Sequence, residues 1–324
     1  MNIPPPFAYF FTTLILLFSA ASIKKSRIID YLGDIILDNS NERIATLSLV
    51  SFSYIMSPFF LSFVLISSFD KWLLRFKNQS NISVLLLAST LLGSLILPFG
   101  NMRNIYITIF LGGGNPCIPL SEFAAIVLPL WISGLIILLA YAYFSTGIDE
   151  IKVKKTKTKK SWKELVFSGI LLIFIIAYFD GKMNILGFLF ITGVFSFAFI
   201  SIETLKQVDW WVLIPAGFVF IVYYILNNLQ FTLNVWGGFL TGSIGSLFLS
   251  SNIISYILPF SGIEKHFILY AISVGGLGGV LGTAESIYIW RKGRIKPNWK
   301  FMFQIYGIYF LVALTILILG GLYG

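Results

Sequence analysis

Two residues of opposite charge, Arg103 and Glu285, lie within stretches that are otherwise apolar enough to cross a membrane. A full charge at mid-bilayer costs at least ~2.5–3.5 kcal/mol, so each side chain needs a partner or a function. A guanidinium binds carboxylate or phosphate oxyanions through two parallel hydrogen bonds, and a buried carboxyl can carry a coupled proton. The pair therefore predicts a site for a small anion, with Glu285 as the coupling residue.

Two other roles fit the same pair. Glu285 could itself hold the proton or cation, with Arg103 tuning its affinity. The two could also form a permanent ion pair that locks two halves of the molecule together, as buried pairs often do. Full transport by a chain carrying Arg103→Glu with Glu285→Arg would exclude Arg103 as the anion ligand.

The stretch around Arg103, LILPFGNMRNIYI (95–107), is expected to interrupt its helix. A helix that stops at Gly100 leaves carbonyls free, and a restart near Asn101 leaves free N–H groups. The partial positive charge at that restart attracts anions. Asn101 and Asn104 would add side-chain donors and acceptors to the site.

The same break recurs later in the chain. LLGSLILPFGNMRNIYI (91–107) aligns without gaps with SVGGLGGVLGTAESIYI (273–289) at an offset of 182 residues. This alignment sets Glu285 opposite Arg103, and it predicts a second break with Gly282, Thr283 and Ser286 at the site. Paired interrupted helices in two halves of a chain are the best sequence pointer to a transport site.

The composition indicates which kind of structure holds these residues in place. Hydrophobic residues make up 57% of the 324 residues and charged residues 11%, and the mean hydropathy is +0.88. These values predict an all-α polytopic membrane protein, because several apolar runs reach the ~20 residues that span a bilayer. The net charge of +9 does not indicate nucleic acid, since Lys and Arg lie almost entirely in short loops.

Loop charge predicts two re-entrant hairpins. The segment 44–68 has basic residues on both sides, so we expect it to enter and leave from the cytoplasm with its turn near Ser57-Pro58. The segment 231–260 lies in a stretch without Lys or Arg and is too short for two spans. We expect a hairpin from outside, with its turn near Ser251-Asn252, so Ser57, Ser251 and Asn252 complete the predicted site.

With two hairpins and about eight full spans, 20 of the 23 Lys and Arg residues fall in cytoplasmic loops. Both termini then lie outside the cell, and the two halves run in opposite directions. The predicted organisation is a first repeat at 1–148 with hairpin 44–68 and broken helix 82–110, a basic cytoplasmic linker at 149–163, and a second repeat at 164–324 with hairpin 231–260 and broken helix 266–290.

These features resemble the ion transporter superfamily, in its branch of arsenite permeases, NhaD-type sodium–proton antiporters and anion permeases. The residues that carry the resemblance are Pro98, Gly100 and Asn104 in the first half and Gly275, Gly279, Gly282, Ser251 and Asn252 in the second. The chain would be a short, divergent member, with Met102 and Ser286 where the family has a proline and an asparagine. The resemblance implies one substrate site between two hairpins and two broken helices, which moves like an elevator against a scaffold.

We therefore expect a secondary active transporter of a small anion in the cytoplasmic membrane, coupled to protons or sodium ions. Arsenite or metalloid efflux and sodium–proton antiport are the alternatives within transport, and a transport-inactive membrane scaffold subunit is the alternative of another class. Neither a metal-ligand cluster nor a nucleophile–base pair is visible, so no enzyme and no cofactor is predicted. The expected partners are the anion, membrane lipid and, as a homodimer, a second copy of the chain.

Overall fold

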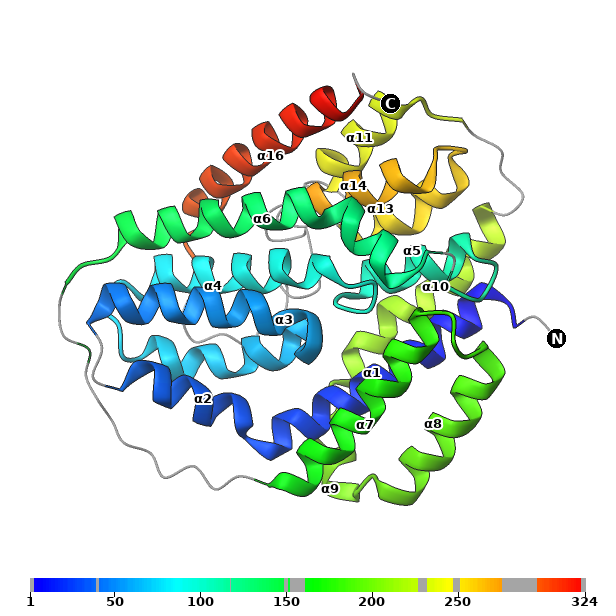
Figure 1. Ribbon diagram of the computed structural model, residues 1–324, viewed down its shortest axis with the longest axis horizontal. Coiled ribbons are helices and arrows are strands. Elements are labelled where there is room, and N and C mark those ends of the chain that lie inside the picture. Colours follow the sequence, from blue (N-terminus) through cyan, green and yellow to red (C-terminus); the bar gives the residue numbers. More distant parts are fainter. Residues whose placement is uncertain are drawn as a thin grey trace.

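The computed structural model describes residues 3–38, 41–116, 118–148, 151, 161–226, 232–246, 251–275 and 296–321 (Figure 1). Over these residues the chain forms helices and no strand, as its composition predicts. In chain order they are α1 (Pro5–Ser26), α2 (Ile28–Leu37), α3 (Glu42–Leu73), α4 (Gln79–Gly93), η1 (Ser94–Ile96), α5 (Met102–Leu111), α6 (Leu120–Ser145), α7 (Trp162–Phe179), α8 (Ile185–Phe199), α9 (Ile202–Leu205), η2 (Trp210–Val212), α10 (Leu213–Leu226), α11 (Val235–Ser243), α13 (Ser251–Ile257), η3 (Leu258–Phe260), α14 (Lys265–Gly275) and α16 (Trp299–Gly321).

Within the described part of the chain, six helical stretches are long and apolar enough to cross a membrane. They are α1, Glu42–Phe60 of α3, Gln79–Ile96, α6, α7 and α16. Shorter apolar helices occupy Met102–Leu111, in the same predicted span as Gln79–Ile96, and Ile185–Phe199, Trp210–Leu226 and His266–Gly275, in three further predicted spans. The chain is therefore an all-helical, multi-pass membrane protein.

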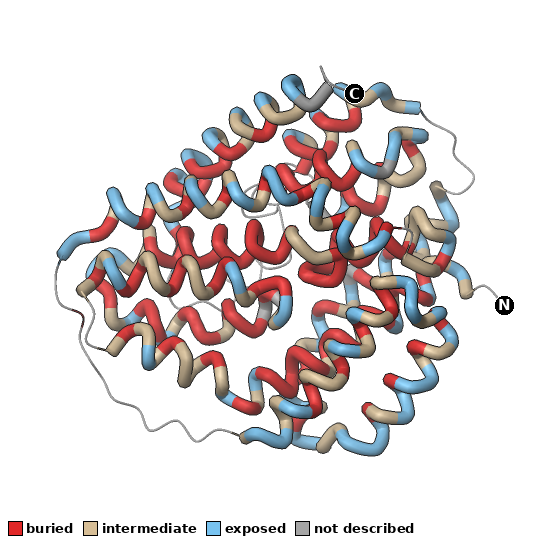
Figure 2. Tube along the Cα trace, in the orientation of Figure 1, coloured by how far each residue is buried: buried red, intermediate tan, exposed pale blue. Residues whose placement is uncertain are grey.

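Helices α1 and α4 form the centre of the molecule. In the most apolar stretch of α1, 72% of the residues are buried, and in that of Gln79–Ile96, which comprises α4 and η1, 78% are buried. The corresponding values are 28% for α6 and 33% for α7 and α16 (Figure 2). The outer helices expose large apolar side chains such as Phe144 and Phe197, which suits a surface in contact with lipid. Residues from the first 100 positions thus make up much of the core.

Helix α3 folds back on itself. The ring centroids of Phe52 and Trp72 lie 6.3 Å apart, whereas a straight α-helix would separate residues 20 positions apart by about 30 Å. Beyond the end of α3, the Asn78 N–H donates to the Glu42 carboxylate at 3.4 Å, so the segment ends where it began. Figure 1 shows the two arms of α3 side by side.

The predicted turn at Ser57-Pro58 is wrong, because both residues lie within the first arm of α3. Proline has no N–H to donate to the carbonyl four positions earlier, which here belongs to Tyr54. The Ser57 hydroxyl donates to that Tyr54 carbonyl instead, at 3.2 Å. The helix therefore continues past Pro58, and the contact between Phe52 and Trp72 places the reversal near Ser62.

In the second predicted hairpin, 231–260, the two ends of the segment also lie close together. The Leu233 N–H donates to the Ser261 carbonyl at 3.1 Å, and α11 and α13 lie between these residues. Residues 247–250, around the predicted tip, lie outside the described residues. Ser251 and Asn252 open α13.

The helix in 82–110 is interrupted and restarts where predicted, but its first part ends before the predicted stop at Gly100. Helix α4 ends at Gly93, η1 carries the chain to Ile96, and α5 begins at Met102. In the second half, α14 is described as far as Gly275, and the remainder of the predicted broken helix, 276–290, lies outside the described residues.

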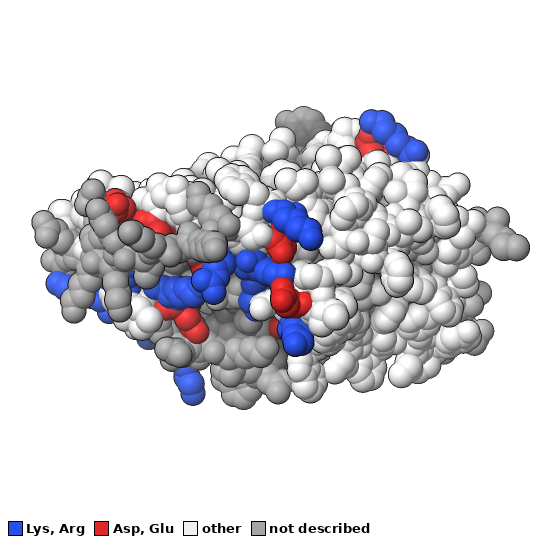
Figure 3. Space-filling model, turned by 90° about the horizontal axis from the view of Figure 1, so that it is seen from below, with Lys and Arg blue, Asp and Glu red and all other residues white. Residues whose placement is uncertain are grey.

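The segments that connect the helices meet at two opposite ends of the molecule, and polar contacts show which segments meet at each end. At one end, contacts join Ser26 with Ser161, Arg43 with Thr146, Lys25 with Glu203, and Ser80 with Lys296. At the other end, contacts join Gly114 with Tyr178, Asn115 with Ile185, and Glu122 with His266. Seen from below, Figure 3 shows charged side chains gathered on one part of the surface, with a large uncharged area beside it. We refer to the first end as the basic end.

Candidate functional site

Asn101 begins α5 and closes the break behind it. Its side-chain oxygen accepts from the Asn104 N–H at 3.0 Å, as an N-cap does. Its amide nitrogen donates to the carbonyl and hydroxyl oxygens of Ser94 at 3.4 and 3.3 Å. One side chain thus joins the start of α5 to the end of the preceding helical segment.

Asn104 binds two more of the freed carbonyls. Its amide nitrogen donates to Leu95 O at 3.2 Å and to Leu97 O at 3.1 Å. Trp131 from α6 donates to the Gly93 carbonyl at 3.0 Å. Side chains of the chain itself thus bind four carbonyls at the break, those of Gly93, Ser94, Leu95 and Leu97, as buried backbone groups require.

Gly100 is needed for this closure. Its N–H donates to Leu97 O at 3.0 Å, and a Cβ on Gly100 would lie only 2.1 Å from the Ser94 carbonyl oxygen. Asn101, Arg103 and Asn104 are each 2% exposed. The structure therefore brings Gly100, Asn101, Arg103 and Asn104 together at the break, and the two asparagine side chains bind backbone and hydroxyl groups of the chain itself.

Arg103 reaches across the molecule to the other half. Its Nη1 donates to the Ile272 carbonyl of α14 at 3.4 Å. This hydrogen bond joins α5 to the helix that the repeat alignment pairs with α4.

The other predicted site residues are placed as follows. Gly282, Thr283, Glu285 and Ser286 lie outside the described residues, so the predicted meeting of Arg103 with Glu285 stays a prediction. Ser57 lies in α3 beside Gly93 rather than at a hairpin tip.

The two aligned glycines, Gly93 and Gly275, have matching surroundings. A Cβ on Gly93 would lie 2.1 Å from Tyr54 O and 2.5 Å from Ser57 Oγ. A Cβ on Gly275 would lie 2.2 Å from Gly242 O and 2.4 Å from Ser246 Oγ. In both places the serine hydroxyl donates to that same carbonyl.

A second correspondence follows the same offset of 182 residues. The Tyr54 hydroxyl donates to the Trp131 carbonyl of α6 at 2.5 Å, and the Tyr270 hydroxyl donates to the Ala313 carbonyl of α16 at 2.6 Å. The acceptors occupy equivalent positions, although the donors come from helices that are not equivalent. Sequence reasoning missed these tyrosines, since a tyrosine in an apolar run is typical of cores and membrane belts alike.

Three buried tyrosines also join the halves beside the break. The hydroxyls of Tyr9 and Tyr256 lie 3.3 Å apart, and the Tyr106 hydroxyl donates to the Tyr256 carbonyl at 3.3 Å. The rings of Tyr106 and Tyr256 are 4.6 Å apart between centroids. This cluster packs α5 against α13, which belongs to the second folded-back segment.

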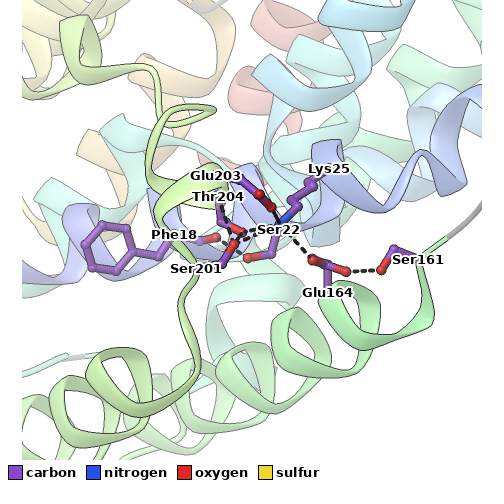
Figure 4. A network of polar contacts seen from close by, with 8 residues as sticks. All are labelled: Phe18, Ser22, Lys25, Ser161, Glu164, Ser201, Glu203 and Thr204. Carbon is purple, nitrogen blue, oxygen red and sulfur yellow. Dashed lines mark hydrogen bonds and ion pairs between the residues drawn. The ribbon is translucent and has the colours of Figure 1, made fainter.

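A charged network links three helices at the basic end (Figure 4). Lys25 of α1 lies 3.0 Å from both Glu164 of α7 and Glu203 of α9, and it donates to Ser201 Oγ at 2.8 Å. Ser161 donates to the Glu164 carboxylate. Helices α7 and α9 lie outside the central helices α1 and α4. The network therefore stabilises the packing of α7 and α9 against α1.

Over the part of the chain that the structure describes, no three His, Cys, Asp or Glu side chains lie close enough to hold a metal ion. Models of known protein families yield no match to this chain, and curated proteins yield none either.

Proposed function

We propose that the chain is a secondary active transporter that moves a small anion across the cytoplasmic membrane by an elevator-like movement. The observation that carries the proposal is the matching environment of Gly93 and Gly275, each packed on a carbonyl and a serine hydroxyl of a folded-back segment. An internal repeat with interrupted helices is the common plan of such transporters. The two folded-back segments would be re-entrant hairpins.

The directions of the helices support an inverted repeat. Helix α4 begins at the basic end, where Ser80 donates to the Lys296 carbonyl at 2.9 Å. Helix α14 begins at the opposite end, where His266 lies 3.2 Å from Glu122. Equivalent helices would thus cross the membrane in opposite senses, with the basic end in the cytoplasm.

In this proposal Arg103 is the anion ligand and Glu285 couples transport to protons or sodium ions. Arg103 is 2% exposed and lies between α5 and α14, where its Nη1 donates to Ile272 O. Binding an anion there would exchange a backbone carbonyl for a charged oxyanion, which is the stronger partner for a guanidinium. The amides of Asn101 and Asn104 would contribute once the break opens.

The test measures flux by the purified full-length chain in proteoliposomes, with separate arms for inorganic anions, small carboxylates, arsenite and sodium-driven proton movement. Arg103→Gln should lower anion flux about tenfold or more, because a hydrogen bond to a charged group contributes ~1.5–3 kcal/mol. Arg75→Gln is the matched control, since Arg75 is a largely buried arginine paired with Asp34 at the basic end. Glu285→Gln should keep anion exchange but lose its dependence on the pH gradient.

Equal anion flux in wild type and Arg103→Gln would exclude Arg103 as the ligand. Flux of arsenite alone, or sodium-driven proton movement alone, would favour the corresponding alternative. A scaffold subunit is favoured by a different observation, namely that the chain's own amides occupy the carbonyls of the break. The absence of flux in every arm, with a folded protein, would support the scaffold and overturn transport.

A further inference from the structure

A cavity of about 320 Å³ lies at the basic end, away from the break. Its walls come from the end of α1, the start of α2, the return arm of α3 and Gln207 after α9. Its charged lining consists of four cations and one carboxylate, namely Lys24, Lys25, Arg27, Lys71 and Asp30. Ser67, Ser68 and Gln207 add neutral polar groups.

Basic residues next to membrane spans are expected in any multi-pass protein, but they usually lie on an open surface. Here the backbone turns them around a hollow. Arg27 has a left-handed conformation with φ of 57°, and it connects α1 directly to α2. This sharp connection brings the last turn of α1 and the first turn of α2 to one cavity.

Within the lining the cations outnumber the carboxylate by three, and one positive charge remains in excess when the two glutamates that Lys25 binds are included. Asp30 forms an ion pair with Lys71 and accepts a hydrogen bond from the Ser68 hydroxyl at 2.7 Å, so its carboxylate is paired with groups of the cavity wall. Lys25 binds Glu164 and Glu203, which lie outside the lining. The first turn of α2 also borders the cavity, where the Ile28 N–H donates to the Ser26 hydroxyl at 3.3 Å.

We propose that this cavity binds a phosphate group, carried either by a lipid headgroup or by free phosphate. Phosphate suits the lining, because Arg27 offers a planar fork, the lysines offer point charges, and Gln207 offers an amide donor. The cavity lies where the apolar span of α1 ends, which is the level of phospholipid headgroups. The proposal is independent of transport, since no predicted transport residue lines the cavity.

The experiment is calorimetric titration of the full-length protein in a nonionic detergent. The probes are inorganic phosphate, dihexanoyl phosphatidic acid and dihexanoylglycerol, which has the same chains without phosphate. The first variant, Lys24→Gln with Arg27→Gln, removes two lining charges. The second, Ser67→Trp, fills the cavity and keeps every charge. The control, Lys77→Gln with Lys300→Gln, removes two exposed charges that do not line the cavity.

We expect phosphatidic acid to bind and dihexanoylglycerol not to bind. Both cavity variants should weaken binding about tenfold or more, as for a lost charge-assisted hydrogen bond, and the control should keep the wild-type affinity. Binding of phosphatidic acid alone assigns the site to a lipid headgroup, and binding of inorganic phosphate as well assigns it to phosphate from either source. The proposal is overturned if neither phosphate probe binds, if Ser67→Trp binds like wild type, or if the control weakens binding as much as the cavity variants.

Discussion

Asn104 illustrates how a residue chosen for chemistry can also serve structure. Its amide was predicted to face a substrate, and in the structure it donates to the carbonyls of Leu95 and Leu97. The sequence showed that the break exposes backbone groups, because Pro98 and Gly100 interrupt the helix. It could not show that Asn101, Asn104 and the distant Trp131 would occupy them, since hydrogen-bond partners depend on tertiary packing.

We predict that Asn104→Ala destabilises the protein by about 1–3 kcal/mol, because buried carbonyls would lose their donor. Thermal unfolding in detergent measures this effect. Asn184→Ala is the matched control, since Asn184 is an exposed cap whose partner, the Gly187 N–H, can bind water instead. An equal loss in the two variants would show that water reaches the break, and the closed site described above would then be wrong.

At the scale of helices, the sequence predicted the break between α4 and α5 and the segments that fold back, but it misplaced the first reversal. Proline alone does not end a helix when another donor replaces its missing N–H. Ser57 supplies that donor to Tyr54 O, and a serine beside a proline carries no distinct signal in the sequence. The repeat alignment pairs Gly93 with Gly275, and each of these glycines lies against a backbone carbonyl and a serine hydroxyl, a close approach that only a small residue allows.

This equivalence predicts that Gly93→Ala and Gly275→Ala have similar costs. Each added Cβ would lie within 2.5 Å of backbone or hydroxyl oxygens, and overpacking of this kind costs ~1–3 kcal/mol, which exceeds the gain in helix propensity of about 1 kcal/mol. Gly169→Ala in α7 is the control, since its Cβ would meet nothing within 4 Å. Thermal unfolding of the three variants tests the repeat, and a cost at only one of the two glycines would argue against it.

At the scale of the molecule, the segments that connect the helices meet in two groups, one at each end. These are the groups that loop charge predicts for the two sides of the membrane. Asn298 near the start of α16 donates to Asn81 near the start of α4 at 2.8 Å, at the basic end. Both ends of the segment from Glu42 to Asn78 lie there too. Connections such as 112–116 and 180–184, which the sequence placed outside, meet at the opposite end. Loop charge carries this information because orientation in a membrane depends on Lys and Arg in short loops.

The two ends should therefore differ in their access to a membrane-impermeant thiol reagent. With Cys117 replaced by serine, single cysteines at the exposed positions Lys77 and Lys300 should react only in inside-out vesicles, and those at Asn184 and Glu264 only in intact cells. Labelling of Asn41→Cys from the same side as Lys77→Cys tests the folded-back α3 directly, because a straight helix of 32 residues would place its ends on opposite sides of a ~30 Å hydrocarbon core. Reaction of positions 41 and 77 from opposite sides would exclude a re-entrant hairpin and, with it, the inverted arrangement on which the proposed transport site depends.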